Sequence, residues 1–204
     1  MNQSSKIAKE SAISFSGMAI GQILRYLFTT FLARWSGPEL LGIYSISNAV
    51  TRITEVIGKL GLDQGVIRAV SREEQFKIKQ LKILSALKIG IITGIIFMCI
   101  QIIIANWLVS NFFDSSDLLG IVISMHAISL PFYIIIHISA NSTQAFKLLK
   151  YKIFVTEIQN PFLLLVGMFI CYYYFSIESV IILPIIFSSI IGFITINIFL
   201  KKIS

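Results

Sequence analysis

The chain has 204 residues, of which 56% are hydrophobic and 13% are charged, and its mean hydropathy is +0.85. A soluble domain usually carries about 25% charged residues, so the composition excludes a water-soluble globule and indicates a polytopic membrane protein. The net charge of +7 would also suit nucleic acid, but the basic residues lie beside the apolar segments, as membrane topology requires. Cys99 and Cys171 both lie in apolar segments, which indicates neither a disulfide nor a metal site.

Six apolar segments are long enough to cross a bilayer, which takes about 20 residues of helix. The links between them are too short for a soluble domain, so the sequence predicts an all-α protein with a single membrane domain over residues 1–204. The expected spans, in chain order, are 12–33, 40–62, 83–107, 118–140, 153–175 and 180–200.

The charges between the spans predict the orientation of the chain. The basic residues lie before span one, in the links after spans two and four, and after span six, whereas the other links are acidic except for Arg34. Cytoplasmic loops are enriched in Lys and Arg, so both termini are expected in the cytoplasm. The basic residues are Lys6, Lys9, Arg68, Arg72, Lys77, Lys79, Lys82, Lys88, Lys147, Lys150, Lys152, Lys201 and Lys202; the acidic ones are Glu39, Asp114, Asp117 and Glu178.

A row of charges follows one face of the second span. Arg52, Glu55, Lys59 and Asp63 are separated by three, four and four residues, which places them on one side of a helix. Because a charge at the bilayer centre costs roughly 2.5–3.5 kcal/mol, these residues should face a protein interior or a hydrated cavity. Arg25 lies near the middle of the first span and is expected at a depth similar to that of Arg52.

Two interpretations of this row are compatible. In the first, Glu55 pairs internally with Arg52 and Lys59, and the row is structural. In the second, the basic residues outnumber Glu55 and form a cationic cavity for an anionic ligand, since guanidinium groups pair with phosphate or carboxylate. Glu55 would then hold Arg52 in place, and Asp63 would cap its helix or pair with Lys59. The predicted binding residues are Arg25, Arg52, Glu55, Lys59, Gln22 and Asn48.

Later spans carry fewer polar residues. His126, Tyr133 and His137 share one face of span four, where buried, hydrogen-bonded histidines are the default and a cavity contact or proton carrier is the alternative. Glu157, with Asn160, begins span five, where it could bind a cation or simply favour the helix N-terminus.

Glycines and prolines within the spans predict close packing and kinks. Gly17 and Gly21 form a small-xxx-small pair that permits close helix packing. Pro131, Pro161 and Pro184 are expected to kink spans four, five and six.

The sequence favours a transporter over an enzyme. It contains no Walker A loop, no G-x-S-x-G nucleophile elbow and no H-E-x-x-H zinc motif. We therefore expect no catalytic residues, no cofactor and no metal.

Two stretches carry a family resemblance. Residues 33–44 read A-R-W-S-G-P-E-L-L-G-I-Y, which resembles the A-R-x-x-G-P-E-x-x-G-x-Y turn between the first two helices of bacterial polysaccharide flippases. Residues 61–68 read G-L-D-Q-G-V-I-R, which resembles the exit from their second helix. The resemblance is to oligosaccharide flippases of the multidrug/oligosaccharidyl-lipid/polysaccharide exporter superfamily, and it is strongest over about residues 10–72.

The resemblance implies a function in surface polysaccharide (O-antigen-type) biosynthesis. Such proteins move undecaprenyl-diphosphate-linked oligosaccharide across the bacterial cytoplasmic membrane, in a cationic cavity between two helical lobes. In the related lipid II flippases, arginines of helices one and two contact the diphosphate, and the matching positions are Arg25 and Arg52. Lys59 would lie at the cytoplasmic entrance. The implied partners are the lipid-linked oligosaccharide and membrane lipids, and no nucleic acid.

The chain resembles only the N-terminal lobe of these exporters. The second lobe would come from a missing C-terminal half, a second copy or a partner subunit. One alternative is a cation-coupled drug exporter of the same superfamily, with Glu55, Asp63 or Glu157 as the coupling acid. Another is a non-transporting membrane subunit or a truncated fragment.

Overall fold

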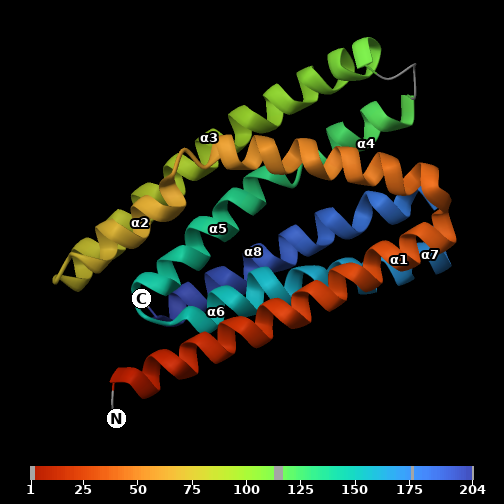
Figure 1. Cartoon of the computed structure of the whole chain (residues 1–204). Coiled ribbons are helices and arrows are strands. Elements are labelled where there is room, and N and C mark those ends of the chain that lie inside the picture. The colour runs from red at the N-terminus through yellow and green to blue at the C-terminus, as the bar shows by residue number, and fades with distance from the viewer. Residues whose placement is uncertain (1–2, 113–116, 176, 204) are drawn as a thin grey trace.

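A computed structural model describes residues 3–112, 117–175 and 177–203 of the chain (Figure 1). Every regular element within these ranges is a helix, which confirms the predicted all-α class. Asp114, and the side chains of Lys6, Lys9, Asp117 and Glu178, lie outside what the structure describes.

The first helix, α1 (Gln3–Gly58), consists of two arms that run in opposite directions. At Gly37 the backbone has φ 81° and ψ 171°, a conformation that residues with a side chain rarely adopt. Pro38 follows and cannot continue the hydrogen bonding of the preceding helix. Figure 1 shows the chain doubling back at this point. We call residues 3–36 the first arm and residues 38–58 the second arm. The first arm contains the first predicted span, whereas the second predicted span, 40–62, extends past the end of the second arm at Gly58. The turn falls inside the stretch 33–44 that resembles the flippases.

The next two helices follow a second left-handed turn. Leu60 and Gly61 both have positive φ, and α2 (Leu62–Ser71) begins directly after them. This short helix is amphipathic: Val66 and Val70 are buried, whereas its Arg68 is exposed. The long helix α3 (Phe76–Phe112) then contains the whole of the predicted third span.

Proline divides the predicted fourth and fifth spans. The fourth consists of α4 (Asp117–Ala127) and α5 (Leu130–Ala145), with Pro131 in the first turn of α5. The fifth consists of α6 (Leu149–Ile153), the π-helical segment η1 (Phe154–Gln159) and α7 (Asn160–Tyr174), whose first turn contains Pro161. The 3₁₀ turn η2 (Ile177–Ile181) leads into α8 (Leu183–Ile203).

Four segments of the described chain are long and apolar enough to cross a membrane. They are Phe76–Asn111, Leu118–Ala145, Leu149–Tyr174 and Ser179–Lys202. They match predicted spans three to six and support a multi-pass membrane protein. The two arms of α1 are helical but more polar, because the rows of charged and small polar residues lower their hydropathy; their crossing of the membrane stays a prediction.

Both termini lie at one end of the helix bundle, together with the α2–α3 junction and the α5–α6 turn (Figure 1). These junctions carry the basic residues, whereas the Gly37 turn, with exposed Glu39, lies at the opposite end. This arrangement is the one that the alternation of loop charges predicts. The assignment of the basic end to the cytoplasm stays a prediction.

A candidate ligand-binding cavity

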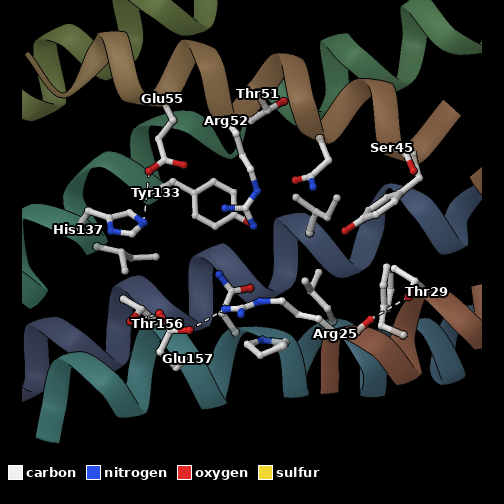
Figure 2. A pocket seen from close by; sticks show the side chains of 18 residues that line it. Arg25, Thr29, Ser45, Thr51, Arg52, Glu55, Tyr133, His137, Thr156 and Glu157 are labelled. Carbon is white, nitrogen blue, oxygen red and sulfur yellow. Dashed lines mark hydrogen bonds and ion pairs between the residues drawn. The ribbon is translucent and has the colours of Figure 1, made fainter. Parts of the chain in front are cut away.

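A cavity of about 330 Å³ lies between the two arms of α1 and the helices α5, η1, α7 and α8 (Figure 2). Its wall contains two arginines and two glutamates, so the predicted excess of basic over acidic residues in the cavity is wrong. Hydroxyl, amide and apolar side chains complete the wall. The polar faces of the two arms thus meet across a central space, which agrees with the prediction that the charged row faces a protein interior or a hydrated cavity.

The second arm contributes one continuous polar face to this cavity. Tyr44, Asn48, Arg52 and Glu55 all line it, at spacings of four, four and three residues. At 1.5 Å per residue, the eleven steps from Tyr44 to Glu55 extend over about 16 Å along the helix axis. The predicted placement of Arg52 and Glu55 on one face is therefore correct. The prediction is wrong for Asp63, which lies in α2 beyond the turn at Leu60 and Gly61.

Glu55 accepts a hydrogen bond from Lys59, lies close to His137 and forms no hydrogen bond or ion pair with Arg52 in the described chain. Its Oε1 lies 3.0 Å from Nζ of Lys59 and 3.2 Å from Nε2 of His137 in α5. The internal pair Glu55–Lys59 is confirmed, but the expectation that Glu55 holds Arg52 is wrong. The carboxylate is already satisfied by a lysine one turn away and by a histidine from the facing helix, so it is not directed toward Arg52.

Arg52 extends into the cavity without a partner (Figure 2). Among the residues that the structure describes, no hydrogen bond or ion pair reaches its guanidinium group. Five N–H donors thus face a polar space in a segment of membrane length. Arg52 is exposed in the structure, so its donors are open to a ligand. At the membrane depth that the sequence predicts, an unpaired guanidinium would be costly, and an anion would satisfy it.

Arg25 of the first arm faces Arg52 from the other side of the cavity and is paired with Glu157 (Figure 2). Its Nη2 lies 2.9 Å from Oε2 of Glu157, and the two side chains are 35% and 28% exposed. Glu157 was predicted as a helix-start acid or a cation ligand, not as the partner of Arg25. The pair joins residues 132 positions apart, so no local spacing could have revealed it.

Close packing at Gly21 brings Glu157 to this position. A Cβ atom at Gly21 would collide with the backbone carbonyl oxygen of Glu157, and one at Gly17 would collide with the side chain of Ile153. The predicted small-xxx-small contact therefore exists, between the first arm and the α6–η1 segment. It places the carboxylate of Glu157 within reach of Arg25, one turn further along the arm.

The remaining predicted residues divide between the cavity and its surroundings. Asn48 lines the cavity, whereas Gln22 is exposed and Lys59 lies outside the wall, bound to Glu55. Asp63 lies in the first turn of α2, where its Oδ1 accepts a hydrogen bond from the backbone N–H of Gln64 rather than from Lys59. An acid in that first turn interacts favourably with the helix dipole.

The predicted stripe of span four is divided by the break before Pro131. His126 in α4 is buried, and its Nε2 lies 2.9 Å from the carbonyl oxygen of Ile181, so the default interpretation holds for it. Tyr133 and His137 in α5 line the cavity instead. Within the described ranges, no group of His, Cys, Asp and Glu side chains could hold a metal ion.

Fold and cavity together define a multi-pass helical membrane protein with arginines directed into a polar interior space. Residues 31–203 match the family described as polysaccharide biosynthesis protein, and the chain belongs to this family. The matched region includes Arg52, Glu55, His137 and Glu157, whereas Arg25 precedes it. No curated protein and no solved structure matches the chain.

Proposed function

We propose that the chain is a flippase, or the N-terminal half of one, that moves undecaprenyl-diphosphate-linked oligosaccharide across the bacterial cytoplasmic membrane. The observation that carries this proposal is the guanidinium group of Arg52, which has no partner among the described residues and faces the cavity opposite Arg25. A role in polysaccharide biosynthesis follows from the family. The step of this biosynthesis that suits a membrane protein with arginines facing a polar cavity is translocation of the lipid-linked intermediate.

The chemistry of the cavity suits the headgroup of such a lipid. Phosphate oxygens pair with guanidinium groups through short, charge-assisted hydrogen bonds. Asn48 and Tyr44, on the same face as Arg52, offer amide and hydroxyl groups to a sugar. Ligand pockets usually measure roughly 300–1,000 Å³, so a cavity of about 330 Å³ is suited to a diphosphate and an adjoining sugar. The polyprenyl tail would stay in the bilayer.

Translocation by alternating access requires a second wall for the cavity. We propose that this wall is a second lobe, supplied by a C-terminal half, a second copy or a partner subunit. All six predicted spans cross the membrane in this proposal, with both termini in the cytoplasm. The chain then acts as a transporter and catalyses no reaction, and rocking of the two lobes carries the headgroup across.

Replacement of Arg52 by alanine in cells that depend on this protein tests the proposal. We expect surface polysaccharide to fall about tenfold or more, because the loss of one charge-assisted pair with phosphate is worth roughly 1.5–3 kcal/mol. Arg34→Ala is the matched control, since Arg34 is exposed near the Gly37 turn and does not line the cavity. Normal polysaccharide output from the Arg52→Ala variant, at equal protein level, would contradict the proposal.

One feature favours a second candidate, a cation-coupled drug exporter. Glu55 and Glu157 both line the cavity and could bind a cationic substrate or a coupling ion. Expression of the protein would then confer resistance to cationic dyes, and Glu55→Gln or Glu157→Gln would abolish it while leaving surface polysaccharide unchanged. Both acids are already paired with basic residues, which is why we place this candidate second.

A further inference from the structure

We infer that Glu157 is a competing anion, which occupies Arg25 in the empty cavity and which a phosphate-bearing ligand displaces. The inference rests on the proposed function, because it concerns how the same cavity receives a diphosphate. It assigns to Glu157 a positioning role: the acid controls whether one or both arginines are available to the ligand.

The contacts of Glu157 show a carboxylate that is held on one side only. Its Oε2 receives the single short contact from Arg25, at 2.9 Å. Its Oε1 receives only a long contact of 3.4 Å from the hydroxyl of Thr156, which also donates to the carbonyl of Lys152. A buried structural pair is normally supported by further hydrogen bonds on the remaining oxygens. Among the residues that the structure describes, those bonds are nearly absent, so an incoming anion meets a weakly supported carboxylate.

The partial exposure of this pair favours exchange. About a third of each side chain is exposed, 35% for Arg25 and 28% for Glu157, whereas Glu55 is 8% exposed. Exposed ion pairs contribute little net stability because water competes with both partners. A diphosphate carries more charge than a carboxylate and presents enough oxygens to contact Arg25 and Arg52 together. Replacement of Glu157 by the ligand therefore gains the second guanidinium group without losing the pairing of the first.

Of the two acids that line the cavity, only Glu157 pairs with Arg25. Glu55 is bound by Lys59 and His137 and so does not compete for Arg25. Arg52 has no partner within the described part of the chain, and it faces Arg25 across the cavity (Figure 2). A ligand anion between the two arginines would lie next to Glu157, and the repulsion between the two negative charges would favour departure of the carboxylate.

The local backbone offers a way for this side chain to leave. Glu157 lies in η1, where the N–H of Asn160 donates to the carbonyl of Val155, five residues back instead of four. Single π-helical turns hold one extra residue and occur frequently at functional sites. Return of this turn to α-helical hydrogen bonding would rotate Glu157 by about 100° relative to α7. Such a rotation would also release the backbone carbonyl of Glu157 from its packing against Gly21, whereas a change of side-chain rotamer would move the carboxylate and leave that packing in place.

Binding of inorganic pyrophosphate to the purified full chain in nanodiscs, at fixed pH and ionic strength, tests this inference. Glu157→Gln keeps the shape of the side chain and removes its charge, so we expect it to bind pyrophosphate about tenfold more tightly than the unmodified chain. Glu39→Gln removes the same charge at an exposed position outside the cavity and should leave binding unchanged. Glu157→Asp, which keeps the charge but shortens the reach, should give a smaller gain and serves if the glutamine variant fails to fold.

A second substitution separates competition from a general charge effect. In the Arg25→Gln background, Glu157→Gln should give less than a twofold gain, because the acid then has no arginine to occupy. A gain that persists at full size without Arg25 would overturn the inference, as would equal or weaker binding by both Glu157 variants in the otherwise unmodified chain. Arg52→Ala should weaken binding in every background.

The same measurements distinguish failure of this inference from failure of the proposed function. If pyrophosphate binds the unmodified chain and binding depends on Arg52, but the Glu157 variants bind no more tightly, the anion site stands and the competing role of Glu157 is refuted. If no variant binds pyrophosphate, both are refuted. If only the Glu157 variants bind, and Arg52→Ala abolishes that binding, both are supported.

Discussion

Two acid–base pairs at the cavity differ in how the fold makes them. Lys59 and Glu55 are one helical turn apart and almost buried, and His137 from α5 also reaches the carboxylate. Arg25 and Glu157 come from distant parts of the chain and are about one-third exposed. The first pair is local and enclosed by its neighbours, and the second is assembled by packing and remains open to the cavity. We therefore expect the first to matter for stability and the second for ligand binding.

The largest expected effect tests the enclosed pair. Glu55→Ala leaves Lys59 without its acceptor and removes the carboxylate beside His137, and breaking a buried pair in this way costs about 3 kcal/mol or more. Unfolding of the protein in detergent, followed by circular dichroism, measures this loss. Glu39→Ala removes an exposed acid outside the cavity and should change the unfolding free energy by less than about 0.5 kcal/mol. Equal stability of the two variants would contradict the expectation that the Glu55–Lys59 pair stabilises the fold.

The next effect tests the packing that assembles the open pair. Gly21→Ala places a methyl group where the carbonyl oxygen of Glu157 lies, and such overpacking costs about 1–3 kcal/mol. Gly42→Ala in the second arm is the matched control, because a Cβ there meets nothing within 4 Å. That control should be neutral or should stabilise the helix by up to about 1 kcal/mol. Thermal unfolding of both variants gives the comparison, and a harmless Gly21→Ala would show that η1 does not rest against the first arm.

A smaller effect is expected when the open pair itself is removed. Arg25→Ala should lower the free energy of unfolding by about 1 kcal/mol or less, since partly exposed pairs contribute little. The same variant should nevertheless weaken pyrophosphate binding severalfold, because it removes one of the two facing guanidinium groups. Parallel unfolding and binding measurements separate the two quantities. A stability loss as large as that of Glu55→Ala would assign a structural role to this pair too.

The smallest effect concerns a third pair, in which Glu73 precedes the segment Phe76–Asn111 and Lys82 lies near its start. Lys82 donates a hydrogen bond to Glu73 at 2.8 Å, and this bond lowers the pKa of the Glu73 carboxyl from its ordinary value of 4.5. A carboxyl with a lowered pKa stabilises the folded state above its unfolded pKa, and this contribution disappears as the pH falls through the folded value. The unmodified chain should thus lose slightly more stability than Glu73→Gln between pH 6 and pH 3. Unfolding curves of both proteins over this range measure the difference, and identical curves would refute it.

The two pairs also differ in whether the sequence alone could predict them. The i,i+4 relation predicted Glu55–Lys59 correctly, because helix periodicity alone places those side chains together. The same reasoning predicted Arg52–Glu55 wrongly, because it could not include His137, which arrives from another helix. The pairing of Glu157 with Arg25 depends on how η1 packs against Gly21, and neither residue carries a local signal for the other.

The sequence by itself determined the membrane class, the order of the helices and the polar face of the second arm. These properties follow from composition and from periods within single segments, which local physics fixes. Only the tertiary structure decided which charge meets which, because that depends on the kinks at Gly37 and Pro131 and on close packing at Gly21. In the tertiary structure Arg52 faces the cavity without a partner in the described chain, whereas Arg25 pairs with Glu157. The sequence could not predict this difference, because contacts between distant helices depend on how their surfaces fit together.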